Sequence, residues 1–180
     1  MKNRPHGFTL IEILVVLALI GILVAMAIPS FNTMLMRRSV QSAANALVTD
    51  IRYARSEALQ RSARVSICSL AAGSEDTCSV GPGPGIWVNG WMVFVDTGAT
   101  PNVRDAGEEI VRVQQPPPNI LSITSGVLRV FTFQANGIAI AANDTLTVIP
   151  TTAGSATNNR VVCTSFNGRP SIRDEGMTGC

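Results

Sequence analysis

The chain has 180 residues, a formal net charge of +2, and a composition that is 46% hydrophobic and only 14% charged. Two of the 14 basic residues, Lys2 and Arg4, precede a long apolar run, so the rest of the chain carries 12 basic and 12 acidic side chains. This balance excludes a strongly basic nucleic-acid-binding domain, and any anion binding must come from a local cluster. The length allows one domain with its own core beside a membrane segment.

The apolar run extends from Phe8 to Ile28 and contains two polar side chains, Thr9 and Glu12. As a helix it would rise roughly 31 Å, at about 1.5 Å per residue, which matches the hydrocarbon thickness of a bilayer. The run exceeds the ~7 to 15 residues of a cleaved secretory signal, and only residues 25–27 offer a small-x-small cleavage site. We therefore expect residues 8–29 to form a transmembrane helix.

Glu12 is the unusual residue of this run. A carboxylate inside a membrane helix costs on the order of 2.5 to 3.5 kcal/mol on insertion scales, so it requires a partner and a purpose. The alternative is a carboxylate that is tolerated because it lies near the interface at the end of the helix.

The segment Gly7–Glu12, which follows a short basic stretch, resembles the class III signal of type IV pilins and type II secretion pseudopilins. The resemblance implies that prepilin peptidase removes residues 1–7 by cleavage after Gly7, and that Phe8 is then N-methylated. It also implies that Glu12 pairs with the N-terminal amine of a neighbouring subunit during assembly. This role agrees with the need of a buried carboxylate for a nearby opposite charge.

The next segment, residues 30–62, carries the pattern of an amphipathic helix. Its apolar residues recur at spacings of three and four, at Val40, Ala43, Ala44, Leu47, Val48, Ile51, Ala54, Ala58 and Leu59. Pro29 removes one backbone donor, and we expect it to kink the helix without ending it, because the pattern resumes at once. The apolar stripe needs a partner, and a β-sheet is the natural one.

Residues 63–180 consist of short β-rich runs separated by Gly, Pro, Asn and Ser. We expect strands at residues 64–69, 85–96, 109–114, 119–124, 127–134, 145–149, 160–165 and 171–173. A stiff connector is expected at residues 116–118 and a turn at Asn136–Gly137. One helix and one sheet make an α+β fold.

Three further segments resemble the GspH/FimT family of minor pilins and pseudopilins. They are the W-x-x-G-W-x-V-F-x-D pattern that starts at Trp87, the D-x-G-E-E-I pattern that starts at Asp105, and the turn in residues 131–137. The helical segment Arg52–Ala58 adds to the resemblance. It implies a type IV pilin-like fold, in which a long N-terminal helix packs with its second half on a C-terminal antiparallel sheet.

Four cysteines follow the apolar run, and we expect them to form disulfides: Cys68, Cys78, Cys163 and Cys180. No C-x-x-C is present and the sole histidine is His6, so a zinc site is not expected. Three pairings are available, and the local one, which closes two short loops, would contribute roughly 3 kcal/mol per bridge. Disulfides would place residues 63–180 in an oxidising periplasm.

No catalytic set is visible, so we expect neither enzyme activity nor a cofactor. Trp87 and Trp91 would face the same side of a strand, which favours core packing. The acidic residues Asp96, Asp105, Glu108 and Glu109 have the oxygen chemistry of a calcium site but not the spacing of an EF-hand, and we expect a solvated acidic loop without a metal.

Residues 168–173 resemble the G-R-x-R sequence with which FimT-type pilins contact DNA. The second arginine comes two positions late and Asp174 follows, so we expect an exposed, salt-bridged turn. A small phosphate-contacting patch of Arg160, Arg169 and Arg173 is the alternative.

The resemblance implies a structural protein, a minor pilin or pseudopilin that passes once through the inner membrane and is incorporated, with an expected position near the tip, into a type IV pilus or a type II secretion pseudopilus. Its partners would be other major and minor pilins, prepilin peptidase and inner-membrane lipid. The alternatives are an H-type pseudopilin for protein secretion and a DNA-binding minor pilin for DNA uptake.

Overall fold

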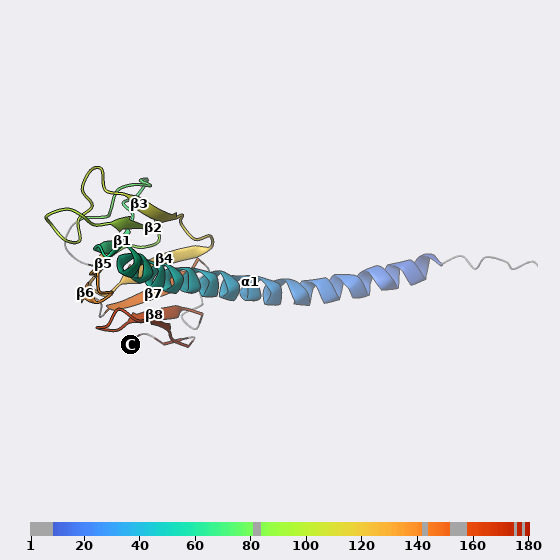
Figure 1. Ribbon diagram of the computed structural model, residues 1–180. Coiled ribbons are helices and arrows are strands. Elements are labelled where there is room, and N and C mark those ends of the chain that lie inside the picture. The colour runs from blue at the N-terminus through green and yellow to red at the C-terminus, as the bar shows by residue number, and fades with distance from the viewer. Residues whose placement is uncertain (1–8, 81–83, 142–143, 152–157, 175, 178) are drawn as a thin grey trace, which may run out of the picture. The chain divides into compact units, whose positions relative to one another are not determined.

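The computed structural model describes residues 9–80, 84–141, 144–151, 158–174, 176–177 and 179–180, except for the side chains of residues 26–30 and 141. The chain divides into two compact units, Met1–Leu35 and Met36–Cys180. We call the second the globular unit. The helix α1 (Leu10–Arg61) runs through both, as the sequence pattern predicts (Figure 1).

Local chemistry sets both ends of α1. At the start, the Thr9 hydroxyl accepts a hydrogen bond of 3.3 Å from the backbone amide of Glu12, the arrangement of an N-cap. At the end, Ser62 has a positive φ of 50° and the Ala63 amide bonds back to the Ala58 carbonyl, which stops the helix. The helix continues through Pro29, and the kink expected there stays a prediction.

In the first unit, α1 exposes a long series of apolar side chains that begins with Leu10, 77% exposed, and Ile11, 70% exposed. Among the described residues, no helix meets the length and apolarity that a membrane crossing requires.

The globular unit contains two antiparallel sheets. The five-stranded sheet has the order β3-β2-β1-β5-β6, and the four-stranded sheet has the order β4-β7-β8-β9. The strands are β1 (Val65–Ser69), β2 (Trp91–Val95), β3 (Ile110–Gln114), β4 (Ile120–Ser125), β5 (Val130–Phe133), β6 (Ala139–Ala141), β7 (Asp144–Pro150), β8 (Arg160–Thr164) and β9 (Pro170–Ile172).

The expected α+β fold, with a long N-terminal helix packed on antiparallel β-structure, is confirmed, but the described strands form two sheets where one was expected. Prolines 116–118, which cannot donate ladder hydrogen bonds, separate β3 from β4. The strand β4 then pairs with β7 at the edge of the second sheet. The two sheets extend to either side of the C-terminal part of α1 (Figure 1).

Two expected strands are shorter than predicted. The strand expected at residues 85–96 begins only at Trp91, because Gly90 turns the chain with a φ of 97° and bonds to the Trp87 carbonyl. Upstream of that turn, Ile86 forms an isolated bridge with Thr124 of the other sheet. The strand expected at residues 127–134 begins at Val130.

The start of β5 is displaced because the amides that would continue it are used elsewhere. The amides of Val127 and Leu128 donate to the carboxylate of Asp144. The turn expected at Asn136–Gly137 is present, with a φ of 72° at the glycine, and it leads into β6, which the sequence pattern did not predict. The three residues of β6 are too few to show an alternating pattern.

The helix and both sheets share one hydrophobic core. The apolar stripe of α1 packs against the five-stranded sheet through residues such as Ile67 and Phe131, and against the four-stranded sheet through Ile123 and Leu146. Trp87 and Trp91 lie fully inside this core, which confirms the packing role predicted for them although they do not share a strand.

A second cluster covers the other face of the five-stranded sheet. It consists of Cys68, Leu70, Cys78, Met92 and Phe94. With both faces covered, every residue of β1 and β2 is buried, which explains the continuous apolar run in β2.

Two disulfides complete the globular unit. Cys68 pairs with Cys78 and Cys163 pairs with Cys180, so the local pairing is the one that forms. The first bridge is buried within the second cluster, whereas Cys180 is exposed.

Candidate functional sites

The first candidate site is the start of α1. Gly7 and Phe8, the predicted cleavage and methylation positions, lie outside the described residues. Glu12 is exposed in the first turn and shares a shallow recess of about 200 Å³ with Ile13, Val16 and Leu17. No other charged residue occurs in the sequence between positions 9 and 35, so a counter-charge for Glu12 must come from elsewhere.

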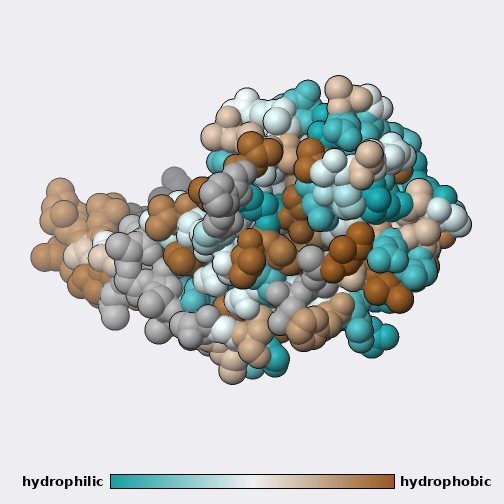
Figure 2. Space-filling model, turned by 90° about the vertical axis from the view of Figure 1, so that its left-hand side faces the viewer, coloured by the Kyte–Doolittle hydropathy of each residue, from teal (hydrophilic) through white to brown (hydrophobic). Residues whose placement is uncertain are grey.

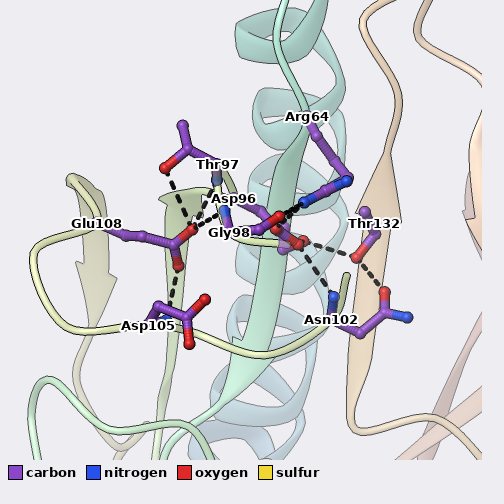
Figure 3. Close-up of polar contacts among 9 residues, drawn as sticks. Arg64, Asp96, Thr97, Gly98, Asn102, Asp105, Glu108 and Thr132 are labelled. Carbon is purple, nitrogen blue, oxygen red and sulfur yellow. Dashed lines mark hydrogen bonds and ion pairs between the residues drawn. The ribbon is translucent and has the colours of Figure 1, made fainter. Parts of the chain in front are cut away.

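The second candidate is the acidic loop between β2 and β3, which Figure 3 shows in close-up. The expectation of a solvated loop is wrong for two of its four acids. Asp96 is 1% exposed and Glu108 is 8% exposed, whereas Asp105 and Glu109 are exposed.

Asp96 is held by three donors from different parts of the chain. The Arg64 guanidinium lies 2.7 Å from its carboxylate, the Ser66 hydroxyl donates at 2.9 Å and the Asn102 amide donates at 3.0 Å (Figure 3). The carboxylate is thus both charge-paired and hydrogen-bonded, which is the condition for burying it.

Glu108 acts as an acceptor for the backbone of its own loop. Its carboxylate receives hydrogen bonds from the amides of Thr97 at 2.6 Å, Gly98 at 2.7 Å and Asp105 at 2.8 Å (Figure 3). These bonds satisfy amides that no strand pairs, so the carboxylate fixes the loop. Within the described residues, no three metal-ligating side chains converge.

A third polar site joins α1 to the five-stranded sheet. Asp50, 1% exposed, accepts a hydrogen bond of 2.8 Å from the Trp91 indole and lies 3.1 Å from the Arg112 guanidinium. Burial raises the pKa of the Asp50 carboxyl, and the Trp91 bond and Arg112 oppose that shift. Arg112 also lies over the Tyr53 ring, 5.5 Å from its centre. The sequence pattern did not predict this site, although an acid next to the apolar stripe of α1 was a signal of it.

The fourth site is a pocket of about 280 Å³ between α1 and the β8–β9 turn. Its lining consists of Arg52, Arg55, Gly168, Arg169 and Pro170, and we call it the arginine pocket. Arg52 donates to the Pro170 carbonyl at 3.5 Å, which links the helix to the turn. The turn is closed by a hydrogen bond of 2.8 Å from the Gly168 amide to the Ser165 carbonyl.

Of the three arginines proposed for DNA contact, only one lines this pocket. Arg169 lines the pocket, whereas Arg160 donates to the Arg173 carbonyl at 3.4 Å and neither residue lines it. The turn is exposed, as expected, but in the described part of the chain no ion pair involves Arg169 or Arg173. Arg52 and Arg55 were not predicted as site residues, although they lie three apart on the helix.

Two family models match the chain. The family model described as "Type II transport protein GspH" matches residues 43–168, and the model of the prokaryotic N-terminal methylation motif matches residues 2–28.

Curated relatives are pilins. The chain is 32% identical over 109 residues to a type IV major fimbrial protein FimA of Dichelobacter nodosus, with 61% of this chain and 64% of the relative covered. It is also 32% identical over 104 residues to the pilin-like protein PilA1 of Thermus thermophilus, with 58% and 56% covered. The chain thus spans less than two thirds of the length of these relatives.

The fold is similar to that of the type IV minor pilin FimU of Pseudomonas aeruginosa. The TM-score is 0.54 at 21% identity, and the match covers 78% of this chain and 97% of the FimU chain. A second crystal form of FimU gives a TM-score of 0.51. Because the GspH model matches well over half of the chain, the chain belongs to the GspH family of type IV pilin-like minor pilins and pseudopilins.

Proposed function

We propose that the chain is a structural subunit of a type IV pilus, inserted into the inner membrane through residues 8–29 and incorporated into the filament after removal of residues 1–7. The proposal rests on the surface of α1 within the first unit. Its apolar side chains are exposed from Leu10 to Val24, and Glu12 is the one charge among them. Such a surface is stable only against lipid or against other apolar helices.

Glu12 supplies the specificity of this packing. In an apolar bundle its carboxylate is costly unless an opposite charge reaches it, and the amine of a processed Phe8 on a neighbouring subunit is such a charge. An ion pair with this amine would offset the free-energy cost of burying the carboxylate, but only when the neighbouring subunit packs in the correct register. Glu12 would then favour assembly without being needed for membrane insertion.

The two disulfides support a periplasmic position for the globular unit, because disulfides persist in oxidising compartments. A pilus is preferred to a secretion pseudopilus because the curated relatives are fimbrial proteins and the similar structures are those of a pilus minor pilin. A position near the filament tip stays a prediction, and so does the H-type role in protein secretion.

The test is incorporation into sheared filaments, measured by immunoblot of the filament and membrane fractions. Glu12→Ala should leave the protein in the membrane fraction at normal level but reduce its amount in filaments. Thr9→Ala, which removes the neighbouring cap and keeps the charge, is the matched control and should be incorporated. Equal incorporation of both variants would refute the role of Glu12.

Processing is tested separately by Gly7→Val. This change should leave a precursor that migrates more slowly on a gel and remains in the membrane. Unchanged mobility would contradict cleavage after Gly7.

A further inference from the structure

The arginine pocket has positive charge without an internal counter-charge. Three of its five lining residues are arginines, and within the described residues none of Arg52, Arg55 and Arg169 forms an ion pair. Other arginines of the globular unit, such as Arg61, Arg64 and Arg112, are each paired with a carboxylate. Guanidinium groups favour bidentate contact with a carboxylate or a phosphate, so the pocket is suited to an anion.

The surroundings of the pocket are apolar. Leu59 follows Arg55 by one helical turn on the same face of α1 and is 51% exposed. Phe166, in the same turn as Arg169, is 77% exposed. The Gly137 backbone lies against Leu59, and the next residue, Ile138, is 55% exposed. Figure 2 shows hydrophobic groups set among hydrophilic ones over the end of the globular unit where β6 lies.

These neighbours favour a protein segment over a nucleic acid. A phosphate backbone presents repeated charge and leaves exposed Leu and Ile side chains without a partner. A protein loop that carries a carboxylate next to apolar side chains satisfies both the arginines and their surroundings.

The globular unit itself has exposed acidic loops of this kind. Glu75 and Asp76 are exposed in the loop after β1, and Asp105 is exposed in the loop after β2. The two loops are joined by a hydrogen bond of 2.8 Å from Arg104 to the Asp76 carbonyl. They lie on the β2–β3 side of the unit, whereas β8 lies on the other side of α1 (Figure 1).

We propose that the arginine pocket binds a carboxylate from an exposed acidic loop of a neighbouring pilin subunit. Opposite charges on opposite sides of one unit produce head-to-tail contacts, which propagate along a filament and do not close a dimer. The proposal rests on the filament function proposed above and adds to it the surface and the chemistry of one contact between subunits.

The contact is tested in cells with the full chain. A photo-crosslinking benzoylphenylalanine replaces Phe166, and crosslinked products are identified by mass spectrometry. We expect a crosslink to an acidic loop of a pilin. Arg52→Glu/Arg55→Glu should reduce this crosslink about tenfold, because like charges at an interface oppose binding. Arg169→Glu, on the turn instead of the helix, should have the same effect.

The matched control is Arg173→Glu, which makes the same charge change at an exposed position outside the pocket and should leave the crosslink unchanged. Disulfide state and membrane level, compared across the variants, identify any misfolded one. A charge reversal in the crosslinked loop of the neighbour should restore the product in Arg52→Glu/Arg55→Glu.

Three outcomes would overturn the proposal. The first is a crosslink that the pocket variants do not reduce, and the second is an equal loss with Arg173→Glu. The third is salt-dependent DNA binding by the detergent-solubilised full chain, lost in the pocket variants while no pilin crosslink forms. Failure of the filament function looks different, because the wild-type chain would itself be absent from sheared filaments.

Discussion

Replacement of Arg64 by alanine should destabilise the globular unit by about 3 kcal/mol. The change leaves Asp96, whose side chain is fully buried, without its charge partner. Removal of one member of a buried ion pair costs about 3 to 5 kcal/mol, because the remaining charge stays desolvated. The Arg64 side chain is 26% exposed, so water reaches the vacated position and the lower value applies. The Ser66 and Asn102 bonds to Asp96 remain.

The assay is urea unfolding of the full chain in detergent, monitored by tryptophan fluorescence. Both tryptophans of the chain, Trp87 and Trp91, are buried in the core and report its opening. With a slope of about 2 kcal/mol per molar urea, the midpoint should fall by roughly 1.5 M.

The control is Arg61→Ala, which breaks pairs with Glu57 and Glu109 at a more exposed position. Exposed ion pairs contribute little to stability because water screens them, so the midpoint should move much less than with Arg64→Ala. If Arg64→Ala is no more destabilising than Arg61→Ala, the argument from the burial of Asp96 is refuted.

Three other predictions concern pH, backbone and redox chemistry. The raised pKa of Asp50 means that the folded state binds a proton more tightly than the unfolded state. The unfolding free energy of the wild type minus that of Asp50→Asn should therefore fall as the pH rises from about 4 to 7. A difference that does not change with pH would contradict the raised pKa. Gly168→Ala, at a φ of 67° and against the Phe133 ring, should lower the free energy of unfolding by about 2 to 3 kcal/mol in the same urea assay. Gly176→Ala, at a φ of 81° with open space around it, should lower it by about 1 kcal/mol. Equal losses would exclude a steric contribution from the Phe133 ring. Under mild reductant, alkylation and mass spectrometry should find Cys180 labelled well before the buried Cys68; the reverse order would contradict the burial of the first bridge.

The sequence predicted the elements that depend on local patterns. The end of α1 at Arg61 follows from apolar spacing that stops there, and the strands with clear alternation or turn boundaries lie within a few residues of their expected positions. The local disulfides agree with the short loops that they close. These features need only the order of nearby residues.

The polar sites could not be predicted because their partners are distant in the sequence. Asp96 looked solvated in its loop, yet Arg64, which pairs with it, precedes it by 32 residues. Likewise, Arg52 reaches the turn at Pro170 over 118 residues, which neither segment indicates alone. The division into two sheets has the same origin, since pairing of β4 with β7 depends on register across the core and not on β4 itself.

The shared core also depends on contacts between segments that lie far apart in the chain. The central strand β1 lies beside β5, and Ser66 is placed opposite Thr132, 66 residues later in the chain. The second sheet is complete only when β8 and β9 are available. During synthesis, therefore, the apolar stripe of α1 emerges long before either sheet can cover it. Contacts of such high sequence separation form slowly. We therefore expect mutations that slow the pairing of β5 or β8 to reduce the yield of folded protein more than they reduce its stability once folded.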